Sequence, residues 1–175
     1  MTNLNSILFP ILTTERLTLR QLTINDQQDI LALRSDPVIN KYLDRQPTQT
    51  REDAVKFINQ VNDNIEKLIA YYWAITWTGT KTFAGTICLF SFSGEKDSCE
   101  IGYELMTKFQ GQGIMKEAAQ AVIAYAYQTL KLKKILAFTH CDNQHSTKLL
   151  EKFDFVKSGD TDRENPNLNL FILTK

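Results

Sequence analysis

Two glycines at the start of a helical segment are the residues whose types and spacing first point to chemistry. Gly111 and Gly113 lie in the stretch FQGQGIMKEA, between a strand-like run and apolar residues at helical spacing. The first amides of a helix lack partners inside the helix and form the positive end of its dipole. Glycines remove side chains that would keep an anion away, so the arrangement predicts a phosphate or pyrophosphate site. The alternative is a plain glycine turn that packs the helix closely on the strand.

Two well-known phosphate motifs do not fit these glycines. A Walker loop ends in Gly-Lys-Ser or Gly-Lys-Thr, and the sequence has neither ending. A dinucleotide-binding fingerprint would need a third small residue where this chain has Lys116, and its strand should stand near the N-terminus.

The strand-like run before the glycines carries two carboxylates on one face. In residues 99–105, CEIGYEL, Glu100 and Glu104 share one face, while Tyr103 and Leu105 share the other. A carboxylate in this position is either a proton acceptor for a substrate or a solvated strand glutamate.

Hydrophobic periodicity supplies the elements that must position these residues. Strands are predicted at residues 16–22, 71–77, 82–92, 98–106, 133–140, 154–160 and 168–174, and helices at residues 23–36, 48–68, 111–130 and 143–153. Thr50 and Asp53 predict a capping box in the second helix, and Pro37 ends the first. The order predicts one α/β (α+β) domain over residues 1–175, with a mixed, mostly antiparallel sheet of about seven strands and about four helices.

The composition excludes several classes of partner. Twenty Lys and Arg residues balance twenty Asp and Glu residues, so no excess of positive charge favours a nucleic acid. The N-terminal run ILFPIL is short and contains Pro10, so we expect neither a signal peptide nor a membrane span. The odd number of cysteines, three, predicts reduced thiols and a cytoplasmic protein. With only two histidines, we expect no zinc site. Cys99 and Cys141 lie in strand-like runs, so we expect both thiols to be buried and inert.

The residues around the glycines resemble the GCN5-related N-acetyltransferase (GNAT) superfamily. The stretch QGQGIM is similar to its Gln/Arg-x-x-Gly-x-Gly/Ala signature: Gln110, Gly111 and Gly113 match, and Met115 stands where Gly or Ala is usual. The segments TERLTLRQLTINDQQDILALRSDP, EIGYELMTKFQGQGIMKEA and DNQHSTKLLEKFDF resemble the RimJ/RimL-like subfamily in order and spacing. The resemblance covers about residues 13–175 and implies the GNAT fold, with splayed strands at the coenzyme A site.

The resemblance also implies where coenzyme A binds. Amides of residues 110–116 would hold its pyrophosphate, and the preceding strand would pair with the pantetheine arm beside the acetyl group. Asn143 resembles an asparagine that bonds the pantetheine arm, and it can also cap a helix. The implied cofactor-binding residues are Leu105, Met106, Gln110, Gly111, Gln112, Gly113, Ile114, Met115, Lys116 and Asn143.

Two residues are implied to move protons. Glu100 matches a strand position where some family members carry a catalytic glutamate, and Ser146 matches the serine used in the RimL-like group to protonate the departing thiolate. Many members place a tyrosine for this step on the last helix, but this chain has no tyrosine after Tyr127. Asp154 replaces the glycine of the family's helix ending, where a left-handed residue is expected.

The resemblance thus implies an acetyl-CoA-dependent N-acetyltransferase, with a primary amine and foremost a protein N-terminal α-amine as acceptor. The alternatives are an enzyme acting on an amino acid, polyamine or antibiotic, and a non-catalytic acyl-CoA-binding module. VINKYLDRQP and DTDRENPN would wall the acceptor groove, with Tyr42, Tyr72 and Trp73 as lining or core residues. We expect no metal, nucleic acid or membrane partner, and a monomer or homodimer.

Overall fold

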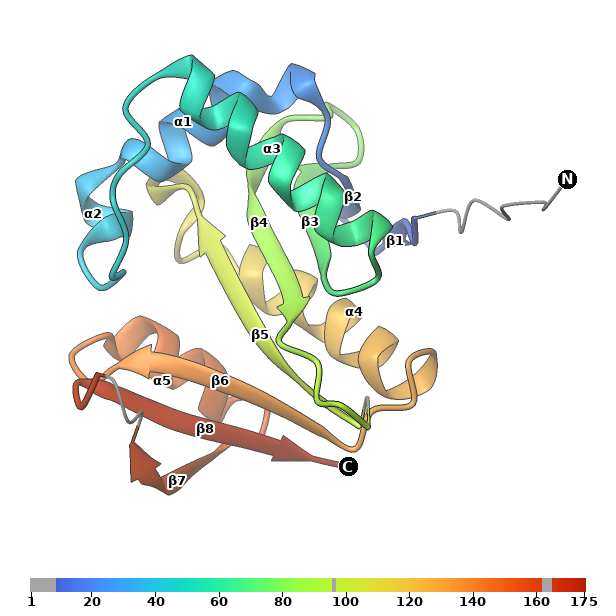
Figure 1. The fold of residues 1–175 in the computed structure, drawn as a ribbon, viewed down its shortest axis with the longest axis vertical. Coiled ribbons are helices and arrows are strands. Elements are labelled where there is room, and N and C mark those ends of the chain that lie inside the picture. The colour runs from blue at the N-terminus through green and yellow to red at the C-terminus, as the bar shows by residue number, and fades with distance from the viewer. Residues whose placement is uncertain (1–8, 96, 162–164) are drawn as a thin grey trace, which may run out of the picture.

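An eight-stranded sheet runs through the protein in the order β1-β2-β3-β4-β5-β6-β8-β7 (Figure 1). The computed structural model describes residues 9–95, 97–161 and 165–175. The strands are β1 (Leu12–Thr13), β2 (Leu17–Gln21), β3 (Tyr71–Trp77), β4 (Phe83–Phe90), β5 (Ser98–Leu105), β6 (Lys134–His140), β7 (Val156–Thr161) and β8 (Leu168–Thr174). Neighbouring strands are antiparallel except β5 and β6, which the crossover helix joins in parallel. The α/β architecture with a mostly antiparallel mixed sheet is confirmed.

One strand more than expected borders this sheet. β1 contains two residues and pairs with β2 through Leu12–Leu19 and Thr13–Thr18. Two residues are too few to show a period of two, so the sequence pattern could not indicate this strand.

The helices follow their local capping signals. They are α1 (Gln27–Ser35), α2 (Pro37–Asn40), α3 (Arg51–Glu66), α4 (Ile114–Gln128) and α5 (Gln144–Glu151), with short 3-10 turns at Ile24–Asp26 and Thr107–Phe109. The capping box of Thr50 and Asp53 opens α3. Pro37 ends α1 as expected, but it also begins α2, because Asp36 caps the amide of Val38 at 2.8 Å.

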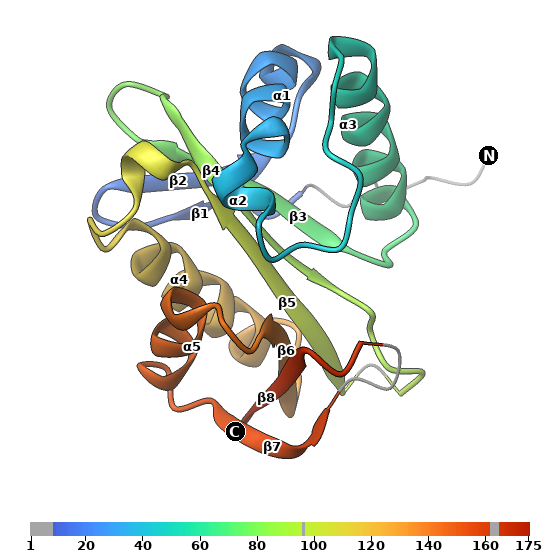
Figure 2. The same ribbon diagram turned by 90° about the vertical axis from the view of Figure 1, so that its left-hand side faces the viewer.

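Helices cover the two faces of the sheet. α1 and α3 lie on one face of the N-terminal half, and α4 lies on the other (Figure 2). The larger core cluster joins α4 to β2 and β3, whereas a smaller cluster joins α1 and α3 to β3 and β4. Trp73 is fully buried in the larger cluster, as an aromatic core residue rather than a groove residue. The N-terminal half of the sheet is therefore packed between two hydrophobic cores, one on each face.

The parallel strands β5 and β6 separate part of the way along (Figure 1). They pair only from Ser98 to Glu100, opposite Lys134 to Leu136. β5 then stays paired with β4 as far as Leu105, and β6 stays paired with β8 as far as His140. The expected splay is therefore present, and its open end faces the start of α4.

The cysteines do not share one environment. Cys99 is buried in β5, and burial raises the pKa of its thiol to about 12. Cys141 is exposed, so the expectation of a buried thiol there is wrong: β6 ends at His140, and the next residue has left the sheet. Among the described residues, no helix is long and apolar enough to cross a membrane.

Candidate active site

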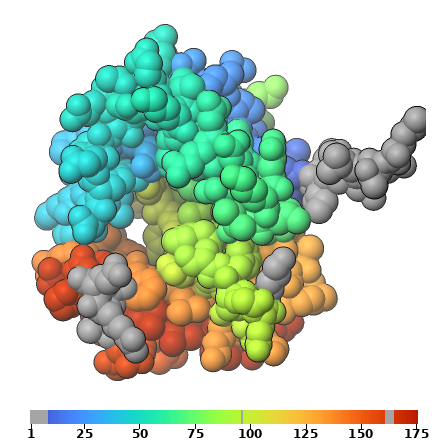
Figure 3. All heavy atoms as spheres, viewed as in Figure 1, coloured from blue at the N-terminus to red at the C-terminus, as the bar shows by residue number. Residues whose placement is uncertain are grey.

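A cavity of about 610 Å³ lies beside the end of β5, where that strand is no longer paired with β6. Its walls come from the end of β5, the start of α4, α5, and the segment around α2, residues 36–45. Figure 3 shows the surface hollowed between the α2 segment and the region of α5 and β6. Both the glycine loop and the carboxylate-bearing strand of the sequence analysis therefore border one space.

The two glycines adopt a backbone conformation that other residues rarely accept. Gly111 has a φ of +75°, and Gly113, the N-cap residue of α4, has a φ of +76°. A β-carbon built at Gly111 would meet nothing within 4 Å, so the requirement there is conformational rather than steric. Both glycines line the cavity. The loop is thus a tight turn that also leaves a helix start open to the cavity, which combines the two readings of the sequence.

A carboxylate on α4 braces this loop against the edge of the sheet. Glu117 accepts hydrogen bonds from the Arg16 amide at 2.8 Å and from its Nε at 2.6 Å. Arg16 also donates to the Gln112 carbonyl at 3.2 Å. Burial raises the pKa of Glu117, but the hydrogen bonds from Thr14 and Arg16 outweigh it and hold the pKa below its usual value. The charged brace fixes the loop's position relative to β2.

Most of the expected cofactor-binding residues border the cavity. The ones that do are Leu105, Gln110, Gly111, Gly113, Ile114, Met115, Lys116 and Asn143. Met115 also packs in the larger core cluster. Met106 and Gln112 are not among the lining residues: Met106 is buried beneath α1 and α3, and the Gln112 side chain donates to the Lys108 carbonyl.

The strand β5 presents backbone groups to the splay. The Met106 amide donates to the Ala84 carbonyl of the β4 side at 2.9 Å. Because alternate residues of an antiparallel strand direct their backbone groups to opposite sides, those of Tyr103 and Leu105 point away from β4. The Leu105 carbonyl accepts from Gln110 at 3.1 Å. The resemblance places Leu105 and Met106 beside the acetyl group, and of their two amides that of Leu105 is the one directed away from β4, toward the cavity.

Ser146 and a tyrosine from the neighbouring strand meet at the cavity wall. The Ser146 hydroxyl lies 2.8 Å from the phenol oxygen of Tyr103, and both residues line the cavity. Asn143 is the N-cap of α5 and accepts from the Ser146 amide at 3.2 Å, as its capping role requires. Burial raises the pKa of Tyr103 to about 12, although the bond with Ser146 lowers it.

The two strand carboxylates have different surroundings. Glu104 lines the cavity, and both of its oxygens accept from the guanidinium of Arg45, with Arg34 3.8 Å away. Glu100 is half-buried four residues earlier, where β5 and β6 are still paired, and it is not among the lining residues. An amine in the cavity could therefore reach Glu100 only through water.

The segment around α2 roofs the cavity and contacts both splayed strands. Arg45 bonds Glu104 of β5, and the Tyr42 ring stacks on His140 of β6 with centroids 5.4 Å apart. The lining residues from this segment are Val38, Ile39, Lys41, Tyr42 and Leu43. Tyr42 thus borders the groove as expected, whereas Tyr72 is not among the lining residues and packs against Phe57. The other expected wall, DTDRENPN, falls in part on residues 162–164, which lie outside the described residues.

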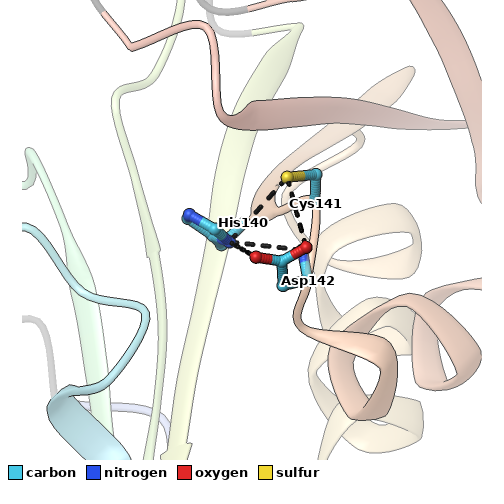
Figure 4. A group of neighbouring side chains, drawn as sticks. All are labelled: His140, Cys141 and Asp142. Carbon is cyan, nitrogen blue, oxygen red and sulfur yellow. Dashed lines mark hydrogen bonds and ion pairs between the residues drawn. The ribbon is translucent and has the colours of Figure 1, made fainter.

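Three potential metal ligands gather at the end of β6 (Figure 4). The Cys141 sulfur lies 4.0 Å from His140 Nδ1 and 3.8 Å from an Asp142 oxygen. These donor types suit transition metals, and a count of histidines overlooks such a mixed set. His140 Nδ1, however, accepts from the Asp142 amide at 3.2 Å, which uses the lone pair that a metal would need. A metal-free site remains the prediction.

Sequence reasoning missed the partners of Ser146 and Glu104. Tyr103 is 43 residues from Ser146, and Arg45 is 59 residues from Glu104. The alternation in CEIGYEL did place Tyr103 and Glu104 on opposite faces of the strand. What it could not indicate was which distant element each face would meet.

Comparisons with known proteins agree with this geometry. Residues 16–156 match the model of the family described as acetyltransferase (GNAT) domain. An uncharacterized N-acetyltransferase of Bacillus subtilis, YoaA, is 32% identical over 152 residues, covering 87% of this chain and 86% of that protein.

Two solved structures share the fold. RimL, a ribosomal L7/L12 α-N-protein acetyltransferase in complex with coenzyme A, has a TM-score of 0.83 at 22% identity, covering 94% of this chain and 98% of that one. The spermidine N-acetyltransferase of Vibrio cholerae, in complex with coenzyme A and spermine, has a TM-score of 0.79 at 20% identity, covering 92% and 96%. Since the family match spans most of the chain, the protein belongs to the GNAT family and is an acetyl-CoA-dependent N-acetyltransferase.

Proposed function

We propose that this enzyme acetylates the α-amine of a peptide or protein N-terminus. The observation that carries the proposal is the charge at the acceptor end of the cavity. Among the described lining residues, Glu104 is the only carboxylate, and both of its oxygens bond Arg45. Lys41 adds a positive charge on the same side. A polyamine would bring several ammonium groups to a wall without an unpaired carboxylate, which like-charge repulsion disfavours.

The acidity of the acceptor supports the same choice. An α-amine has a pKa near 8, so about one in ten molecules is neutral at pH 7. A lysine-type amine has a pKa near 10.4, so keeping it neutral costs about 3 kcal/mol more. A site whose nearest carboxylate is already paired suits the weaker base, because less proton abstraction is required of it.

The residues around the splay fit coenzyme A. The amides at the start of α4 would hold the pyrophosphate, and the lysines on α4 and α5 that line the cavity would hold phosphate charge; they are Lys116, Lys148 and Lys152. The backbone edge of β5 at Tyr103 and Leu105 would pair with the pantetheine arm. Asn143 stands beside that path, at the N-terminus of α5. RimL and the spermidine N-acetyltransferase, which share this fold, are both known in complex with coenzyme A.

The chemistry then divides among three groups of this chain. The Leu105 amide polarises the thioester carbonyl as the amine attacks its carbon. Glu100 accepts the proton of the amine through water, since it lies below the cavity on the same strand face as Glu104. Ser146 protonates the departing thiolate, which needs little help because a free thiol has a pKa near 8.5.

An amine panel tests the acceptor. One peptide has a free N-terminus and no lysine, a second has the same residues with a blocked N-terminus and one lysine, and the third acceptor is spermidine. Release of coenzyme A thiol should give the first peptide the highest kcat/KM, at least about tenfold above the others, because its amine is the least protonated. Faster turnover of spermidine would overturn the proposal and leave the enzyme a small-molecule acetyltransferase.

A further inference from the structure

Two hydroxyl groups at the cavity wall, those of Tyr103 and Ser146, are hydrogen-bonded to each other, and the chemistry proposed above gives Tyr103 no part. Tyr103 comes from β5, at the level where that strand has left β6, and Ser146 comes from the first turn of α5. Their oxygens are 2.8 Å apart, and both residues line the cavity. We propose that Tyr103 is a positioning residue that acts through Ser146: it directs the serine proton toward the departing thiolate and replaces that proton as it leaves.

The donor protons and acceptor lone pairs of the two side chains support a proton transfer from Tyr103 to Ser146. A serine hydroxyl has one proton to donate and two lone pairs that can accept. In the resting protein, either hydroxyl can donate to the other. When the Tyr103 phenol donates, it occupies one lone pair of Ser146 and leaves the serine proton to point into the cavity. Without Tyr103, the serine proton has no fixed direction.

Acidity explains why a phenol is useful behind a serine. An aliphatic hydroxyl is a far weaker acid than a phenol, whose ordinary pKa is near 10. A serine that gave up its proton alone would remain as a costly alkoxide. Burial raises the pKa of Tyr103 to about 12, so the phenol carries its proton at neutral pH and is still a stronger acid than the serine hydroxyl that it resupplies.

The step balances without any further reactant. The amine nitrogen bonds to the thioester carbon, and the carbon–sulfur bond breaks with its electron pair on sulfur. The Ser146 proton moves to sulfur while the Tyr103 proton moves to the serine oxygen. The proton lost by the acylated amine passes through water to Glu100 and then to the solvent, and the phenolate regains a proton from the solvent. The products are one amide and one thiol.

The inference rests on the role proposed for Ser146, so a double-mutant cycle tests both. Tyr103→Phe keeps the ring and removes the hydroxyl. It should lower kcat about tenfold with little change in the KM for acetyl-CoA. This is less than the roughly 10²-fold loss usual for a general acid, because the thiolate leaves readily and Tyr103 acts only through Ser146. Because Tyr103 acts through Ser146, the double variant Tyr103→Phe/Ser146→Ala should be no slower than Ser146→Ala alone.

The chain offers a matched control in Tyr127. Its hydroxyl donates to the Leu173 carbonyl at 3.0 Å, burial also raises its pKa to about 12, and it is not among the cavity-lining residues. Tyr127→Phe should leave kcat unchanged. Thermal unfolding of each variant checks that the fold is retained.

A proton inventory supplies a readout that a purely structural role would not move. In mixtures of light and heavy water, kcat of the wild type should curve, because two protons move, and kcat of Tyr103→Phe should be linear. Additive losses in the cycle, or the same inventory in both proteins, would overturn the relay. An unchanged kcat in Ser146→Ala would remove the role of Ser146 itself. Neither result bears on the acceptor, because the assay uses whichever amine of the panel is fastest.

Discussion

The two carboxylates of β5, Glu100 and Glu104, are the groups proposed to govern how the acceptor loses its proton. Glu104 borders the cavity, but its oxygens are engaged by Arg45, so accepting a proton would disrupt those bonds. Glu100 is half-buried at the closed end of the splay. Glu104 therefore lines the cavity as the partner of Arg45, and Glu100 is the proposed base.

The first prediction separates these two glutamates. Glu100→Gln should flatten the rise of kcat/KM with pH and cost about 10²-fold, because the base acting through water is lost. Glu104→Gln should instead raise the KM for the acceptor and keep the pH dependence, because it frees Arg45 at the acceptor wall. Both effects are measured from pH–rate profiles of the two variants with the best peptide acceptor. If the Glu100→Gln profile overlays that of the wild type, bulk-connected water takes the proton.

At the scale of elements, the start of α4 depends on backbone conformation more than on side chains. Gly113 precedes the first helical residue with a φ of +76°, and the brace of Arg16 and Glu117 sets the loop against β2. The loop can present its amides to the cavity because no side chain stands at Gly111 or Gly113.

The second prediction concerns that conformation. A left-handed backbone costs an L-residue about 1–2 kcal/mol, so Gly113→Ala should destabilise the protein by about that amount. If the strain is relieved by moving the loop, affinity for acetyl-CoA should fall about tenfold, the equivalent of 1.4 kcal/mol. Thermal unfolding and calorimetry measure the two effects.

Gly79→Ala is the control for this change. Gly79 lies in the turn between β3 and β4, without a positive φ and with nothing within 4 Å of an added β-carbon. The Gly79→Ala variant should bind acetyl-CoA with the affinity of the wild type. Unchanged affinity in both Gly111→Ala and Gly113→Ala would mean that the loop does not hold the pyrophosphate.

At the scale of the whole molecule, the cavity lies where separate parts of the chain meet. The α2 segment closes over the splay and reaches β5 through Arg45 and Glu104, and β6 through Tyr42 and His140. It also reaches the turn after β5, because Thr107 donates to Asp36 at 2.9 Å. The α2 segment, the proposed acceptor wall, is thus held to both strands that diverge beside the cavity.

The third prediction tests this attachment. Arg45→Gln removes the bidentate bond to Glu104, and the α2 segment loses one of its ties to the sheet. The KM for the peptide should rise roughly tenfold, the magnitude expected when a hydrogen bond to a charged group is lost. The KM for acetyl-CoA should change little, because the phosphate side of the cavity is formed by α4 and α5. Steady-state kinetics with each substrate varied in turn measures both values.

Arg51, an exposed arginine at the start of α3, provides the matched control for this change. Arg51→Gln should leave both KM values unchanged. An equal rise in both KM values for Arg45→Gln would indicate a general loosening of the cavity rather than an effect at the acceptor wall.

The sequence by itself determined the features that depend on neighbouring residues. The capping box of Thr50 and Asp53 and the cap of α5 at Asn143 are present as predicted. Asp154 has a φ of +63° at the end of α5, as expected of a residue replacing glycine there. Each of these requires only a few residues along the chain, and each involves a backbone group that must find a partner or a permitted conformation.

Only the tertiary structure decided which side chains share the cavity. The pairs Tyr103–Ser146 and Arg45–Glu104 depend on strand order, on the divergence of β5 from β6, and on where α2 lies. Cys141 is exposed because it follows the last residue of β6, His140, where the chain turns toward α5. Periodicity assigns a residue to a face, but the partner of that face is set by packing between segments far apart in sequence. The glycine turn at the start of α4 could therefore be predicted from the sequence, whereas the hydroxyl pair and the paired glutamate could not.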